Sequence, residues 1–173
     1  MWIMSSEPTT VIDKRFSDPA AEATPWSEAE RVLTEAELYW ITTVRRDGRP
    51  HVTPLVGVAD GDVVHFTTGL EEQKARNLKH NQHVALTTGN NTWDRGLDVV
   101  VEGSAVRVTD QETLQRIADA YVAKYGSAWQ FEVGDGVFRH GTENEAGVFR
   151  IEPEKVIAFA KEPHAQTTYR RAG

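Results

Sequence analysis

Residues 40–55 read WITTVRRDGRPHVTPL, and this stretch decides the predicted fold. Apolar and polar residues alternate on both sides of Asp47-Gly48, a dipeptide typical of tight hairpin turns. We therefore predict an antiparallel pair of strands here, with the return strand running from His51 to Val58. Pro54 has no N–H to donate to a strand ladder, which places its strand at a sheet edge or beside a bulge.

Further strands are predicted outward from this hairpin, because other short apolar runs are also bounded by turn residues. Asp60-Gly61 turns the chain into the next strand, and Gly103 marks a bulge or bend in a long one. Residues 129–133 form either a short strand or an ordered loop. The remaining strands cover residues 63–68, 84–88, 97–108, 146–151 and 155–161.

Three helices are predicted between these strands. Each is expected to begin at a capping box, in which a Ser or Thr is followed three residues later by Glu. The pairs are Ser27 with Glu30, Thr68 with Glu71, and Thr109 with Glu112. The helices then cover residues 27–36, residues 70–80, and a third segment that stops near Gly126.

Short strands joined mostly by tight turns predict a mainly β fold with flanking helices, an antiparallel barrel with two to three helices. The length of 173 residues suits a single domain. Residues 1–25 lack periodicity and are predicted to form an N-terminal arm, followed by one domain over residues 26–173. The tail from Glu162 onward has no apolar repeat, so it is either frayed or docked where hydrogen bonds are wanted, and fraying is the default expectation.

The composition narrows the choice of partners and compartment. A formal net charge of -7 and a pI of about 5.4 disfavour a nucleic-acid partner, which needs a clustered basic surface. The chain has no cysteine, which is compatible with a reducing compartment and favours a cytoplasmic protein. No apolar run approaches the length needed to cross a bilayer, so no membrane partner is expected.

Two threonines and a short basic helix form the first candidate site. Its residues are Thr67, Thr68, Lys74, Arg76 and Asn77. Together with the free N–H groups of the first helical turn, these side chains can seat a phosphate. Glu71 and Glu72 favour the alternative of a capped surface helix, because carboxylates in the first turn repel an anion.

The strand before this helix has one half-polar face. His51 and Thr53 alternate with Val52 and Pro54, so one side can offer hydrogen bonds to a heterocycle. A barrel strand with one solvent-facing side gives the same pattern. Trp93 stands in a polar loop, where it either anchors a ligand pocket or packs against its own barrel.

Metal binding is not expected. None of the six histidines forms an i, i+4 pair, and cysteine ligands are absent.

The order of these motifs resembles the pyridoxamine 5'-phosphate oxidase-like split-barrel family, in particular its flavin and deazaflavin (coenzyme F-420) oxidoreductase branch. The motifs are residues 40–55, Phe66-Thr67-Thr68, residues 74–78 and Val99 to Gly103, and the resemblance runs from about Trp26 to Arg170. It implies a homodimer of antiparallel split β-barrels of the FMN-binding type, with cofactor sites in the grooves between the subunits.

The resemblance also implies residue roles. Thr67, Lys74, Arg76 and Asn77 would hold the cofactor phosphate, and residues 51–54 would lie along the ring. Trp93 and the tail residues Gln166, Thr167 and Arg170 would complete the site from the other chain.

The implied function is that of a coenzyme F-420-dependent oxidoreductase that transfers hydride to a small unsaturated organic substrate. The protein then binds and orients the cofactor, and we assign no catalytic residue. The alternatives are an FMN-binding, pyridoxamine 5'-phosphate oxidase-like oxidoreductase and a non-catalytic flavin- or haem-binding protein. The C-terminal substrate-phosphate groups of pyridoxamine 5'-phosphate oxidase itself have no residue match in this chain.

Overall fold

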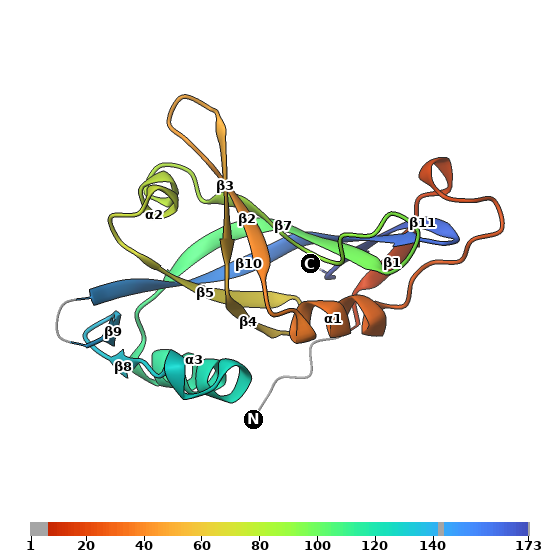
Figure 1. Ribbon diagram of the computed structural model, residues 1–173. Helices are drawn as coiled ribbons and strands as arrows, with labels where there is room; N and C mark the ends of the chain where they lie inside the picture. The colour runs from red at the N-terminus through yellow and green to blue at the C-terminus, as the bar shows by residue number, and fades with distance from the viewer. Residues whose placement is uncertain (1–6, 142–143, 173) are drawn as a thin grey trace.

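The computed structural model describes residues 7–141 and 144–172 (Figure 1). Within these residues the strands form one sheet of eleven, and every strand pair is antiparallel. The strands are β1 (Thr9–Ile12), β2 (Tyr39–Val44), β3 (Pro50–Leu55), β4 (Gly57–Asp60), β5 (Val63–Gly69), β6 (His83–Thr88), β7 (Leu97–Val108), β8 (Glu132–Val133), β9 (Phe138–His140), β10 (Asn144–Lys161) and β11 (His164–Arg170). The helices are α1 (Trp26–Glu35), α2 (Gln73–Leu78) and α3 (Gln111–Tyr125), with single 3-10 turns at Lys14–Phe16 and Ser127–Trp129.

The long strand β10 holds the sheet together. One of its edges pairs first with β9 and then with β7 along most of its length, and the other edge pairs with β5 and β11 in turn. From β7 the sheet continues through β6 and β2 to β3, while β4 extends β5. The predicted fold class, an antiparallel β architecture with flanking helices, is confirmed. Because β3 ends this path, the predicted edge position of the Pro54 strand is also confirmed.

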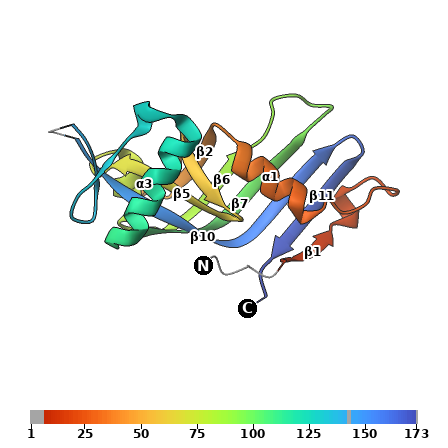
Figure 2. The ribbon, with the colours of Figure 1, turned by 90° about the horizontal axis from the view of Figure 1, so that it is seen from below.

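Two apolar clusters fill the fold. The first lies between the sheet and α1, where Leu33 packs against buried side chains that include Tyr39, Ile41 and Phe66. The second lies under α3, where Leu114, Ile117 and Tyr121 meet Phe138 and Val148. Figures 1 and 2 show α1 and α3 on the same side of the sheet, with α2 on the other side. The helix α2 therefore reaches the first cluster from a different side than α1, through its buried Leu78.

The helices begin at other residues than the predicted capping boxes. Pro25 precedes α1 and makes no side-chain cap, so the predicted role of Ser27 is wrong. Asp110 caps α3 by accepting a hydrogen bond from the Thr113 N–H at 2.8 Å, because a carboxylate at this position is a stronger acceptor than the Thr109 hydroxyl.

The helix α2 is shorter than predicted. The Gly69 carbonyl accepts from the Glu72 N–H at 3.0 Å, and the Glu72 carboxylate accepts from the Gly69 N–H at 3.1 Å. This closed turn delays the helix until Gln73, so the predicted Thr68 to Glu71 box is wrong.

The breaks between strands also differ from the prediction. The predicted strand 51–58 is divided between β3 and β4. Conversely, the two strands predicted over 146–151 and 155–161 are one continuous β10, because a register shift between Pro153 and Lys155 lets the strand pass its irregular point. The irregularity lies opposite Gly103, so the bulge is in the partner strand of the glycine rather than in its own.

The tail is not frayed, and the prediction for it is wrong. Its strand β11 pairs with β10 on one side and with β1 on the other. The Thr24 N–H donates to the Thr167 hydroxyl at 3.0 Å, and the buried Tyr169 hydroxyl donates to the Thr24 carbonyl at 2.6 Å. Residues 7–25 of the predicted arm are thus attached to the tail, whereas residues 1–6 lie outside the described part.

Replacing Tyr169 by Phe tests this attachment. The Tyr169→Phe variant should lose about 1 kcal/mol of unfolding free energy, because the buried Thr24 carbonyl loses its donor. Urea denaturation followed by circular dichroism measures the change. Thr168→Ala is the control, since its side chain points to the opposite face of β11. Equal midpoints for the two variants would contradict the proposed contribution of this hydrogen bond.

Candidate functional site

A group of polar side chains, three of them buried, gathers where α2 meets the barrel. We call it the α2 corner: His51, Thr68, Glu72, Lys74 and Asn77. The Asn77 side-chain amide donates to the Thr43 hydroxyl at 2.9 Å, which fixes α2 against β2. Residue His51 is the ladder partner of Thr43, so the histidine stands next to this contact.

Lys74 is the central cation of the α2 corner. Lys74 is only 7% exposed, and its ammonium group forms an ion pair with the Glu72 carboxylate. Partial burial by itself raises the pKa of Glu72, but hydrogen bonds from Lys74 and from the Gly69 N–H outweigh this effect and lower it. The carboxylate therefore stays ionised. It contacts the Lys74 ammonium group in the way that a phosphate oxygen would.

Strand β3 carries two polar atoms that are buried and have no partner. They are His51 Nδ1 and Thr53 Oγ1, and among the described residues Arg107 Nε is the third such atom. Burial, followed by the charges of Arg45 and Lys74, lowers the pKa of His51, so its ring is neutral at physiological pH. Buried polar groups are nearly always satisfied in proteins, so two unpartnered groups on one edge strand mark a place for a ligand.

The threonine pair divides between two faces of β5, as the alternation of a strand requires. Thr68 is buried and hydrogen bonds with Glu72, whereas the Thr67 hydroxyl donates to the Gly147 carbonyl at 3.1 Å. Arg76 is exposed on α2 and pairs with Glu71 at 3.3 Å. Val52 and Pro54 lie on the outer face of β3, away from His51.

Trp93 lies far from the α2 corner of its own chain. It is 85% exposed in the loop between β6 and β7, which Figure 1 shows on the other side of the molecule from α2. Lys161 fixes this loop by donating to the Asn90 and Thr92 carbonyls at 2.6 and 2.5 Å. Of the ten predicted residues, the α2 corner contains His51, Thr68, Lys74 and Asn77, and Thr53 lies on the same face of β3 as His51.

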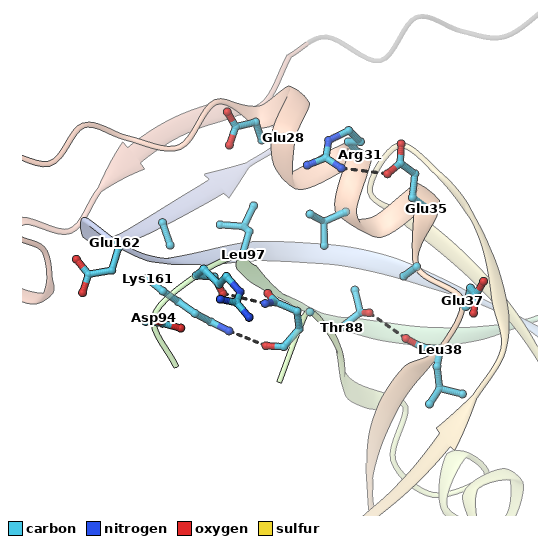
Figure 3. A pocket seen from close by; sticks show the side chains of 17 residues that line it. Glu28, Arg31, Glu35, Glu37, Leu38, Thr88, Asp94, Leu97, Lys161 and Glu162 are labelled. Atoms are coloured by element: carbon cyan, nitrogen blue, oxygen red, sulfur yellow. Dashed lines mark hydrogen bonds and ion pairs between the residues drawn. The ribbon is translucent and has the colours of Figure 1, made fainter. Parts of the chain in front are cut away.

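A larger cavity than any at the α2 corner lies elsewhere in the structure. It measures about 860 Å³ and lies between α1 and the β6–β7 loop (Figure 3). Charged side chains of both signs line it, among them Glu28, Arg31, Asp94 and Lys161. None of the predicted site residues lines it, so the sequence did not indicate this cavity.

Two residues in or beside the α2 corner were missed from the sequence. Thr43 was assigned no role, although a polar residue at an inward position of an alternating strand is a usable signal. Glu72 was considered only as a repelling charge, whereas it is the partner of Lys74. Across residues 7–141 and 144–172, no three His, Cys, Asp or Glu side chains gather as a metal site requires.

Comparison with known proteins identifies the family. The family model described as pyridoxamine 5'-phosphate oxidase matches residues 26–160, which is more than half of the chain. The chain therefore belongs to the pyridoxamine 5'-phosphate oxidase family. No curated protein matches the chain.

Solved structures share the fold at low sequence identity. A conserved hypothetical protein from Mycobacterium tuberculosis is 22% identical with a TM-score of 0.63, over 79% of this chain and 85% of the other. A heme binding protein from Mycobacterium smegmatis is 14% identical with a TM-score of 0.66, over 86% and 60%. The heme storage protein of Vibrio cholerae is 19% identical with a TM-score of 0.59, over 78% and 91%. These similarities establish the fold alone.

Within the described part of the chain, no helix has the length and apolar character to span a membrane.

Proposed function

We propose that this protein is an oxidoreductase that reduces a small unsaturated organic molecule. It binds coenzyme F-420 at the α2 corner and along β3. The observation that carries the proposal is the pair of buried, unpartnered atoms on His51 and Thr53 beside the buried cation Lys74. Family membership supports a cofactor with a phosphate and a flavin-like ring. When bound, such a cofactor supplies the hydride chemistry.

The residues of the α2 corner divide the binding between charge and hydrogen bonds. Lys74 supplies the positive charge for a phosphate, and Asn77 holds α2 in place through Thr43. A neutral His51 has one donor and one acceptor nitrogen, so it can bond a ring heteroatom without adding charge. Thr53 adds a hydroxyl on the same side of the strand, and the outer edge of β3 offers backbone groups along the ring.

A homodimer completes this proposal. Trp40 and Val52 are about half exposed, at 49% and 54%, on the outer face of the β2–β3 hairpin. A second copy that covers this face would bury both side chains and bring a second chain beside the free edge of β3. Trp93, exposed on its own chain, is then available to the cofactor site of the partner.

Separate titrations with coenzyme F-420, FMN and haem test the proposal. We expect the deazaflavin to bind most tightly, because its longer anionic tail can reach further donors around the α2 corner. Fluorescence or absorbance changes report binding, and sedimentation velocity reports whether the protein is a dimer. Tight FMN binding without any binding of coenzyme F-420 would replace the proposed cofactor by FMN.

A non-catalytic haem-binding protein is the second candidate. Its support is that two solved structures of this fold are described as heme binding and heme storage proteins. Preferential haem binding with no bound flavin or deazaflavin in the same titrations would favour this candidate and reject the oxidoreductase.

A further inference from the structure

A second cavity lies on the other face of β5, away from the α2 corner. It measures about 440 Å³ and is formed where β4, β5, β7 and β10 meet the start of α3. His65 lines it, and an odd separation from Thr68 puts these two residues on opposite faces of β5. The cavity is therefore separated from the α2 corner by the sheet.

Two guanidinium groups act on one buried imidazole in this cavity. His65 is 8% exposed, and Arg116 of α3 and Arg150 of β10 line the same space. His65 faces Arg150 directly in the β5–β10 ladder. Burial lowers the pKa of His65 to about 4, and the charges of Arg150 and Arg116 act in the same direction, against a hydrogen bond with the Val58 backbone. The imidazole is thus neutral and surrounded by positive charge.

The other charged groups of the lining leave this positive field in place. Arg107 belongs to the lining, although its guanidinium donates to the Gly136 carbonyl at 2.9 Å. The Asp110 carboxylate accepts from the N–H and the hydroxyl of Thr113, and Asp60 is exposed at the end of β4. Asp110 interacts electrostatically with Arg116, and Arg150 pairs with the Glu152 carboxylate. Even so, no carboxylate raises the pKa of His65, whereas both arginines lower it, so the charges that act on the ring are positive.

We propose that the cavity formed by His65, Arg116 and Arg150 binds the phosphate group of a small metabolite, at a site distinct from the cofactor site. Guanidinium groups match the oxygens of a phosphate with paired hydrogen bonds. His65 adds a third contact in its protonated form, which a bound anion favours over the neutral form. The volume leaves room for more than a bare ion, because small-molecule pockets begin at about 300 Å³.

The test follows the ring signals of His65 by NMR, assigned with a His65→Asn variant. Sulfate is the first probe, because it stays fully ionised while the histidine titrates. We expect saturable shifts of the His65 signals, and a rise of its pKa by about one unit, equivalent to about tenfold tighter binding to the protonated form. Shifts at His51 instead would report binding at the α2 corner, so the two sites are distinguished in one experiment.

Matched arginine variants decide whether the cavity is responsible. Arg150→Gln should weaken sulfate binding at least several-fold, while Arg139→Gln should leave it unchanged. Both arginines are about half exposed and pair with a glutamate, but only Arg150 lines the cavity. Unshifted His65 signals, or equal effects of the two variants, would overturn the proposal.

Inorganic phosphate and glycerol 3-phosphate then identify the ligand class. Tighter binding of the ester supports a phosphorylated metabolite. Equal binding of the two would restrict the site to the free ion and overturn the metabolite assignment.

Discussion

Replacing Gly103 by Ala should lower the unfolding free energy by about 3 kcal/mol, at the upper end of the range for overpacked sites. A Cβ atom at Gly103 would lie 2.1 Å from the Glu152 carbonyl oxygen and 2.9 Å from its carbonyl carbon. Both are backbone atoms of β10, so no side-chain rotation can relieve the contact. The strand would have to move at its own irregular point, between Pro153 and Lys155.

Urea unfolding at a fixed protein concentration measures this effect, since the stability of the proposed dimer would depend on concentration. Ser104→Ala is the matched control, because the neighbouring side chain points to the other face of β7 and its loss should cost no more than about 0.5 kcal/mol. A Gly103→Ala variant as stable as the Ser104→Ala variant would mean that β10 adjusts freely around the glycine.

Replacing Lys74 by Ala should weaken cofactor binding by about 1.5–3 kcal/mol, the range for a hydrogen bond to a charged group. Lys74 is the buried cation of the α2 corner, so water does not screen it as it screens Arg76. Fluorescence titration with coenzyme F-420 measures the loss. Lys79→Ala is the control, because Lys79 is an exposed cation at the end of the same helix. Unchanged affinity in Lys74→Ala would remove the α2 corner from the cofactor site.

Because Glu72 pairs with Lys74, a second substitution is expected to change the cofactor affinity in the opposite direction. Glu72→Gln removes the carboxylate that holds Lys74 but leaves a side-chain oxygen to accept from the Gly69 N–H. Cofactor affinity should therefore rise in Glu72→Gln while it falls in Lys74→Ala. A loss of affinity in both variants would mean that the ion pair positions the lysine rather than competing for it.

Local patterns predicted the strands well because their causes are local. The Asp47-Gly48 hairpin, the edge position of Pro54 and the span of β7 all follow from turn chemistry, the missing proline donor and apolar alternation. The helix starts were harder, because several acceptors near each start compete. At α3 the acidic Asp110 displaced the Thr109 hydroxyl, and at α2 a closed turn at Gly69 postponed the helix.

Features set by distant pairing could not be read from the sequence. The tail has no apolar repeat of its own, and it is ordered because β10 and β1 bind it on both sides. The candidate site likewise has residues that local spacing predicts and contacts that only the fold determines. Lys74 and Asn77 follow from helical spacing, whereas the pairing of His51 with Thr43 depends on the hairpin register. The sequence also could not reveal that His65 and Arg150 face each other, because the two residues are 85 positions apart in the chain.

The position of β10 after β5 and β7 in the sequence has a consequence during synthesis. β5 and β7 leave the ribosome well before the strand that pairs with both of them. Until β10 follows, each presents a strand edge with unpaired backbone groups, the kind of surface on which incomplete chains aggregate. Synthesis of β10 therefore closes two exposed strand edges at once.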